Sequence, residues 1–199
     1  MRRSNPRVLL DCDGPMADFM GATLGVYKDI TGKAVDPNSL TKWYFTDQLF
    51  PEKEEGQLSD QAREFWRRLR APGYCMSLKP IPGAVESVGR ILEAGIDVHV
   101  VTSPMKDSPT WAFERETWLA GHFKLPRQRI HHSNAKHIYS GDLFLEDNPD
   151  NLLEWGDHNP TGATLLWDTP SNRNSSAFSR VKTWSEIEEI LFSRKRRRA

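Results

Sequence analysis

Two aspartates stand one residue apart at the end of the first apolar segment of the chain. Asp11 and Asp13 flank Cys12 and are followed by Gly14. If residues 7–13 form a strand, side chains at positions i and i+2 project to the same side, so both carboxylates face one site while Cys12 points into the core. Two neighbouring carboxylates repel each other and need a cation or a shared proton. The segment therefore predicts a cation-binding or proton-transferring site, with an ordinary Asp-x-Asp-Gly turn as the alternative.

Polar side chains also end two later apolar segments, and a lysine precedes one of them. These residues are Thr102, Ser103, Lys136, Glu146 and Asp147. Taken singly, the lysine is typical of a solvated surface, and the Thr-Ser-Pro sequence is typical of a loop start. In open α/β sheets, ligands bind outside the carboxyl ends of the strands. We therefore expect these side chains to meet the two aspartates at one site.

Alternating strand-like and helix-like segments position these residues. Strands are predicted at residues 7–13, 97–103, 141–147 and 163–168, with a weaker one at 129–132. Helices are predicted at 83–94, closed by Gly95, at 108–120, closed by Gly121, and at 184–192. This alternation predicts an α/β protein with a parallel sheet flanked by helices.

Residues 16–78 interrupt the alternation. They contain two amphipathic helical segments, 17–30 and 60–69, and no clear buried strand. So long an insertion exceeds a simple strand-to-helix connection, and its aromatic residues suffice for a small core of its own. We predict a small helical cap over the strand ends at 16–78, inserted after the first strand of a core formed by 1–15 and 79–193. Residues 194–199 are predicted to be a solvated basic tail.

The charge of the chain is balanced overall but segregated. The 199 residues include 27 Lys and Arg and 27 Asp and Glu. Eight of the cations lie at the two ends, so the body carries 19 cations against 27 anions. An acidic body repels a polyphosphate backbone, which disfavours extended nucleic-acid binding.

The composition also bears on the compartment and on partners. With 38% hydrophobic residues and no run of about 18 apolar residues, the chain has no predicted membrane span. The first residues lack the apolar region of a secretory signal, and two cysteines cannot form a disulfide framework. We therefore predict a cytoplasmic protein without a membrane partner. The sequence does not determine the oligomeric state, and a homodimer stays open.

The chain resembles the haloacid dehalogenase (HAD) superfamily of phosphotransferases over nearly its whole length. Asp11 and Asp13 stand at motif one, the Thr102-Ser103 pair at motif two, Lys136 at motif three, and the Glu146-Asp147 pair at motif four. The resemblance implies a HAD-like, Rossmann-type parallel sheet.

Within the superfamily, the chain is most similar to the 5′(3′)-deoxyribonucleotidases. The similarity lies in the opening segment, which reads Asp11-Cys12-Asp13-Gly14-Pro15-Met16-Ala17-Asp18-Phe19 and follows the pattern Asp-x-Asp-Gly-x-x-Ala-Asp-Phe. Residues 80–86 and 102–106 and the spacing from Lys136 to Glu146 are similar to the same family. Glu146 stands where relatives usually have Asp, and Asn148 where some have a basic residue.

The resemblance implies a two-step phosphatase reaction on deoxyribonucleoside monophosphates. Asp11 would attack phosphorus and form an aspartyl-phosphate, and Asp13 would act first as general acid and then as general base. Lys136 would offset the charge of Asp11 and of a phosphate oxygen. Thr102 and Ser103 would donate to the other phosphate oxygens.

Mg²⁺ is the cofactor that the resemblance implies. Its predicted ligands are Asp11, Asp147 and the backbone carbonyl of Asp13, with Glu146 close to the metal. Lys106 and Arg115 are predicted to add positive charge near the phosphate, or else to be exposed helix residues.

The predicted cap supplies candidates for binding the nucleobase. Phe19 directly follows motif one. The segment Trp43-Tyr44-Phe45 lies in the part of the cap that supplies aromatic residues around the base in the resembling family. Aromatic faces can stack on a base. For Phe65 and Trp66 we instead expect burial in the core of the cap.

Three further features have mainly structural interpretations. His131, His132 and His137 form a cluster, but adjacent histidines on a strand face opposite ways, which disfavours zinc. Cys12 is not expected to be a nucleophile. Asp150 is interpreted as the cap of a helix that begins near residue 151, with support of the metal as the alternative.

Two alternatives to a nucleotidase stay open. One is a phosphatase that acts on nucleic-acid ends or on another small phosphomonoester, with the basic ends contributing. The other is a catalytically silent HAD domain that only binds nucleotides, against which the complete motif set argues.

Overall fold

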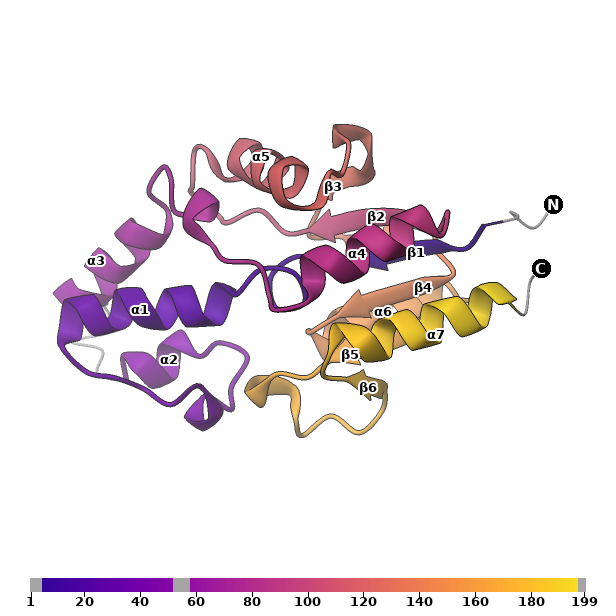
Figure 1. The fold of residues 1–199 in the computed structure, drawn as a ribbon. Helices are drawn as coiled ribbons and strands as arrows, with labels where there is room; N and C mark the ends of the chain where they lie inside the picture. Colours follow the sequence, from indigo (N-terminus) through magenta and orange to yellow (C-terminus); the bar gives the residue numbers. More distant parts are fainter. Residues whose placement is uncertain (1–4, 52–57, 197–199) are drawn as a thin grey trace.

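A six-stranded, all-parallel sheet forms the centre of the structure, a computed structural model that describes residues 5–51 and 58–196. The strands lie in the order β3-β2-β1-β4-β5-β6 (Figure 1). Their bounds are β1 Arg7–Leu10, β2 Asp97–Thr102, β3 Ile130–His132, β4 Leu143–Glu146, β5 Ala163–Trp167 and β6 Ser179–Val181. All five predicted strands are present, but β1 was predicted to reach residue 13 and ends at Leu10, so Asp11 and Asp13 follow the strand and do not lie within it. The sixth was missed because three residues, one of them buried, give no readable alternation.

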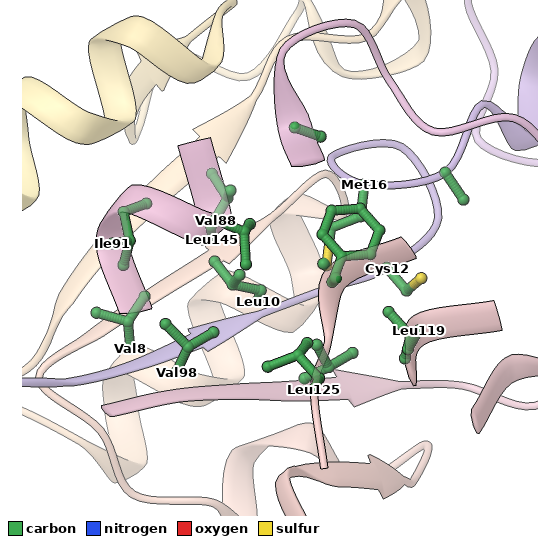
Figure 2. Packing of buried hydrophobic residues seen from close by; sticks show 14 of the residues in the cluster. Val8, Leu10, Cys12, Met16, Val88, Ile91, Val98, Leu119, Leu125 and Leu145 are labelled. Atoms are coloured by element: carbon green, nitrogen blue, oxygen red, sulfur yellow. The ribbon is translucent and has the colours of Figure 1, made fainter. Parts of the chain in front are cut away.

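Helices cover both faces of the sheet, as predicted. The helices outside the predicted cap are α4 Ala84–Glu93, α5 Trp111–Phe123, α6 Pro149–His158 and α7 Trp184–Arg196. Val8 and Leu10 of β1 belong to a core cluster shared with α4, α5 and α7, and Figure 2 shows Leu10 near Val88 of α4. Leu9 faces the other way, into a smaller cluster that includes Trp155 of α6. The alternation of β1 thus fills both layers.

Two helix ends differ from the prediction. α5 begins at Trp111 and runs through Gly121 to Phe123, because Phe123 is buried in the core and a Cβ at Gly121 would meet nothing within 4 Å. Burial of one more turn outweighs the glycine penalty of about 1 kcal/mol. α7 continues to Arg196, so the first three residues of the predicted basic tail are helical. The remaining part of that tail, 197–199, lies outside the described residues.

A helical segment lies between β1 and α4, beyond the carboxyl ends of the strands (Figure 1). It contains α1 Phe19–Thr31, α2 Thr46–Leu49 and α3 Asp60–Leu69, with short 3-10 turns η1 Pro37–Ser39 and η2 Cys75–Ser77. Its buried residues form a separate cluster of Tyr27, Leu40, Leu49, Phe65 and Leu69. The aromatic content noted in the sequence therefore supplies an independent core.

Two backbone hydrogen bonds join the entry and exit of this segment. The amide of Asp18 donates to the carbonyl of Lys79 at 2.9 Å, and the amide of Ile81 donates to the carbonyl of Met16 at 2.8 Å. This pairing fixes the start of α1 directly after the Asp11–Asp13 segment. Asp18 then caps α1 by accepting from the amide of Gly21.

None of the helices in the described ranges is long and apolar enough to cross a membrane.

Trp155 of α6 belongs to the smaller core cluster. It is fully buried, packs on Phe144 with ring centroids 5.6 Å apart, and donates its indole N–H to the carbonyl of Tyr139 at 2.8 Å. We expect Trp155→Ala to lower the free energy of unfolding by about 3–5 kcal/mol. Leu153→Ala, on the same helix but 59% exposed, should change it by less than about 0.5 kcal/mol. Urea unfolding of both variants tests this, and equal losses would contradict it.

Candidate active site

A cavity of about 600 Å³ lies where the strand ends meet the helical segment. Its wall on the sheet side includes Asp11, Asp13, Ser103, Lys136, Glu146 and Asp147. Its wall on the helical side is largely aromatic. A site of this size, with polar groups on one side and aromatic rings on the other, suits a small amphipathic ligand.

The loops after β1, β2 and β4 and the short turn η4 bring the charged residues together. The amide of Asp11 donates to the carbonyl of Leu145 at 2.8 Å, which aligns the end of β1 with that of β4. Lys136, in η4 (Lys136–Ile138), then lies with Nζ at 2.7 Å from Asp11 Oδ1 and 2.6 Å from Glu146 Oε2. All three side chains are buried. The sequence prediction that Lys136 faces the site is consistent with this geometry.

The protonation equilibria of this cluster are strongly perturbed. Burial raises the pKa of Glu146 to about 7, Asp11 adds to that effect, and Lys136 opposes it. Burial also raises the pKa of Asp147, and the charge of Glu146 raises it further. Burial alone would lower the pKa of Lys136, but Asp11 and Glu146 raise it above its ordinary value. The cluster holds three carboxyl groups and one ammonium, so ionisation of all three carboxyl groups leaves excess negative charge.

This excess charge and the ligand chemistry fit a hard divalent cation. Carboxylate oxygens of Asp11, Glu146 and Asp147 lie within 4.8 Å of one another, and all are oxygen donors. Glu146 is already engaged by Lys136 and by the amide of Asn148 at 3.2 Å. Asp11 and Asp147 are therefore the better placed ligands, and Glu146 orients Lys136.

Gly14 keeps the space beside Asp147 open. Its φ is +99°, and a Cβ at this position would lie 2.6 Å from Asp147 Oδ2. Any other residue would strain the backbone and push the carboxylate away. The glycine of the Asp-x-Asp-Gly segment is thus required by the site as well as by the turn.

Asp13 lines the same cavity but has a different partner. Its Oδ1 accepts a hydrogen bond at 2.5 Å from Nη2 of Arg115, whose side chain is completely buried. Burial raises the pKa of Asp13, and Arg115 opposes that shift. The alternative that Arg115 lies exposed on its helix was wrong, because its side chain is buried behind Asp13. Cys12 is fully buried, as expected, and burial raises the pKa of its thiol.

Of the three predicted phosphate-binding residues, two line the cavity and one does not. Ser103 and Lys106 line the cavity. Thr102 is fully buried, does not line the cavity, and its hydroxyl has no hydrogen-bond partner among the described atoms. Thr102 is the last residue of β2 and faces the interior, whereas Ser103 follows the strand.

The predicted aromatic residues Phe19, Trp43 and Tyr44 all line the cavity. Trp66 packs against the core of the helical segment, as expected, but it also lines the cavity. Phe65 is fully buried, as expected. Phe45, which lies in the same predicted segment of the cap, lines the cavity as well. Sequence reasoning missed one more aromatic residue of the wall, Trp111, because nothing local marks it.

The wall also holds several uncharged polar residues, of which the sequence analysis noted only Asn148. The others are Asn134, Asn151, Thr169 and Ser171. They follow β3, β4 and β5, so the rule that ligands bind at the carboxyl ends of strands could have found them. Asn148 also caps α6, accepting from the amide of Asp150 at 2.9 Å. The interpretation of Asp150 as the cap was therefore wrong.

The histidines do not converge on a metal site. His131 hydrogen-bonds to His99 at 2.9 Å, His132 lies 3.5 Å from Glu116, and the His137 ring lies near His158. Across residues 5–51 and 58–196, the only cluster of acidic, histidine and cysteine side chains suited to a metal is Asp11, Glu146 and Asp147.

The parallel sheet, with a helical segment inserted after its first strand, defines a HAD-like fold. Solved structures with the same fold include a HAD family hydrolase from Deinococcus radiodurans R1 with bound phosphate and sodium, with a TM-score of 0.57, 12% identity, and coverage of 96% of this chain and 97% of that one. A haloacid dehalogenase-like hydrolase from Streptococcus pneumoniae has a TM-score of 0.57, 13% identity, and coverage of 94% and 99%.

The family follows from the sequence match. Residues 5–197 match the family described as "5' nucleotidase, deoxy (Pyrimidine), cytosolic type C protein", and the chain belongs to this family. A relative is the mitochondrial 5′(3′)-deoxyribonucleotidase of Mus musculus, which is 26% identical over 201 residues, 96% of this chain and 87% of that protein. The predicted resemblance is thereby confirmed, and the chain is a HAD-type hydrolase. Its cytoplasmic location stays a prediction.

Proposed function

We propose that the protein is a Mg²⁺-dependent phosphatase that hydrolyses deoxyribonucleoside monophosphates through an aspartyl-phosphate on Asp11. The observation that carries this proposal is the convergence on one cavity of Asp11, Asp13, Lys136 and Asp147 opposite a wall of aromatic rings. Membership of the nucleotidase family supports it further.

In the first step, an oxygen of Asp11 attacks phosphorus. The bond between phosphorus and the sugar oxygen breaks, and its electron pair leaves with that oxygen, which takes a proton from Asp13. In the second step, a water oxygen attacks the phosphorus of the aspartyl-phosphate and gives its proton to Asp13. The bond to Asp11 breaks, which releases inorganic phosphate and restores both aspartates.

The environments of the two aspartates support these different roles. Asp11 lines the cavity with Oδ1 at 2.7 Å from Nζ of Lys136, which holds the proposed nucleophile in place. Asp13 has a raised pKa, which favours the protonated form that a general acid needs. Ser103, Lys106 and Lys136 would bind the phosphoryl oxygens. Thr102 can join them only if its buried hydroxyl turns toward the cavity.

The cation would be held by the carboxylates of Asp11 and Asp147 and by the backbone carbonyl of Asp13. When bound, it would neutralise charge on the phosphoryl group.

We expect chelation by EDTA to abolish phosphate release, and added Mg²⁺ to restore it. Asp147→Asn should raise the Mg²⁺ concentration needed for half-maximal activity, because it removes one of the two charged ligands proposed to hold the cation. Asp157→Asn, an exposed position on α6, is the matched control and should leave that concentration unchanged. Full activity of the wild-type protein in EDTA would contradict a metal requirement.

The aromatic wall would bind the nucleobase. Tyr44 lines the cavity yet is 74% exposed, so its loss should not affect folding. Since base stacking contributes about 1–3 kcal/mol, Tyr44→Ala should raise KM by roughly 5- to 150-fold with little change in kcat. Phe113→Ala is the control, because Phe113 is 73% exposed but does not line the cavity. An unchanged KM for the Tyr44 variant would remove Tyr44 from the substrate site.

The decisive experiment measures inorganic phosphate released from a panel of ribo- and deoxyribonucleotides, each with and without Mg²⁺. The expected result is Mg²⁺-dependent release, fastest from deoxyribonucleoside monophosphates. Preference for phosphorylated oligonucleotide ends, bound with a steep salt dependence, would contradict the proposed substrate. No activity on any phosphomonoester would indicate a domain that only binds nucleotides.

A further inference from the structure

A completely buried arginine lies directly behind the proposed general acid. Arg115, on α5, donates from Nη2 to Asp13 Oδ1 at 2.5 Å and from Nη1 to Cys12 Sγ at 2.8 Å. Its guanidinium packs against the rings of Trp111 and Trp118, at 5.1 Å and 5.6 Å from their centroids.

This arrangement is poorly suited to stabilising the fold. Asp13 is the one carboxylate that pairs with Arg115 among the described residues, and its side chain is 26% exposed at the cavity. Cys12 offers a neutral thiol, and Nε of Arg115 has no hydrogen-bond partner in the described part of the chain. Burying a guanidinium with so few partners costs several kcal/mol, and an apolar side chain of similar volume would often be as stable or more stable.

The contact does constrain Asp13. Oδ1 accepts a hydrogen bond from a completely buried side chain that packs against two tryptophan rings, which restricts rotation of the carboxyl group. No hydrogen bond to Oδ2 occurs among the described residues, which leaves that oxygen to carry the proton. A fixed acid needs no reorganisation at the moment of proton transfer.

We propose that Arg115 is a positioning residue that holds the Asp13 carboxyl group in the orientation for proton transfer to the leaving sugar oxygen. This proposal rests on the proposed function, in which Asp13 is the general acid. It goes beyond the four HAD motifs, because Arg115 lies in none of them and contacts the reaction only through Asp13.

The test compares two leaving groups. A nucleoside oxygen needs a proton from Asp13, whereas 4-nitrophenolate leaves without one. The ratio kcat/KM reports only the steps up to loss of the leaving group, so the later role of Asp13 as base does not affect it. We expect Arg115→Met to lower kcat/KM for a deoxyribonucleotide roughly 10²-fold, near the lower end of the range for loss of a general acid. For 4-nitrophenyl phosphate, the same substitution should lower kcat/KM by less than about fivefold. Arg115→Lys should recover part of the loss.

A double-mutant cycle separates positioning from a structural role. In an Asp13→Asn background, Arg115→Met should reduce kcat/KM for the deoxyribonucleotide by no more than about threefold, because its target is already gone. Urea unfolding of each variant shows whether it is folded. If Arg115→Met does not fold, Arg115→Lys keeps the charge in the core and shows the same dependence on leaving group.

Two outcomes would overturn the proposal, and they differ. Equal losses on both substrates, or full additivity with Asp13→Asn, would make Arg115 a structural residue and leave the proposed function intact. If Asp13→Asn itself shows no dependence on the leaving group, Asp13 is not the general acid, and the proposals for both residues fail together.

Discussion

Asp11→Asn is expected to abolish phosphate release, the largest effect that the structure predicts for any single substitution. The amide cannot act as the attacking carboxylate, and it also removes a charged ligand from the proposed cation site. Because uncatalysed phosphate-monoester hydrolysis is among the slowest reactions known, no detectable background turnover should remain. The measurement is release of inorganic phosphate from a deoxyribonucleotide in the presence of Mg²⁺.

Folding should survive this substitution. Lys136 keeps its contact with Glu146 at 2.6 Å, and one of three crowded carboxylates becomes neutral. Asp157→Asn, at an exposed position, controls for loss of a carboxylate elsewhere. Acid quenching of wild-type protein during turnover should trap a phosphate on the peptide that contains Asp11, and the variant should lack it. Turnover by Asp11→Asn near the wild-type rate would refute the aspartyl-phosphate mechanism.

Asp13→Asn is expected to reduce kcat on a deoxyribonucleotide by roughly 10²- to 10⁴-fold, the range for loss of a general acid and base. Its amide can still accept the hydrogen bond from Arg115, so the side chain should stay in place. The loss in kcat/KM should be smaller for 4-nitrophenyl phosphate, whose leaving group needs no proton. The measurement is the pair of kcat/KM values, with KM taken separately.

Stability provides the control for this second variant. Neutralising Asp13 leaves the buried guanidinium of Arg115 without its carboxylate, so the free energy of unfolding should fall, by up to about 3–5 kcal/mol. A variant that is destabilised but shows the same loss on both substrates would point to a damaged site and against proton transfer by Asp13.

The fold was largely predictable from the sequence because its signals are local. Each apolar run with a polar end became a strand of the sheet, and the interruption at 16–78 coincides with helices that share their own core. Errors arose at helix ends, as in α5, where burial of Phe123 decided the length. Such burial depends on neighbours distant in sequence, which a helical pattern does not report.

The sequence by itself determined which residues carry the proposed chemistry. Chain order puts Asp11 and Asp13 directly after the first apolar run, and the order of the later motifs adds Lys136 and Asp147. These inferences depend on backbone geometry and chain order, which any sequence contains.

Only the tertiary structure decided which partners these residues have. Arg115 lies 102 positions from Asp13 along the chain, and whether its helix turns it toward solvent or toward the core depends on how α5 packs on the sheet. The same holds for the burial of Thr102 and for Trp66 and Trp111 in the cavity wall. The physical reason is that a side chain's chemistry is set by its type, but its pKa, orientation and accessibility are set by groups that folding brings beside it.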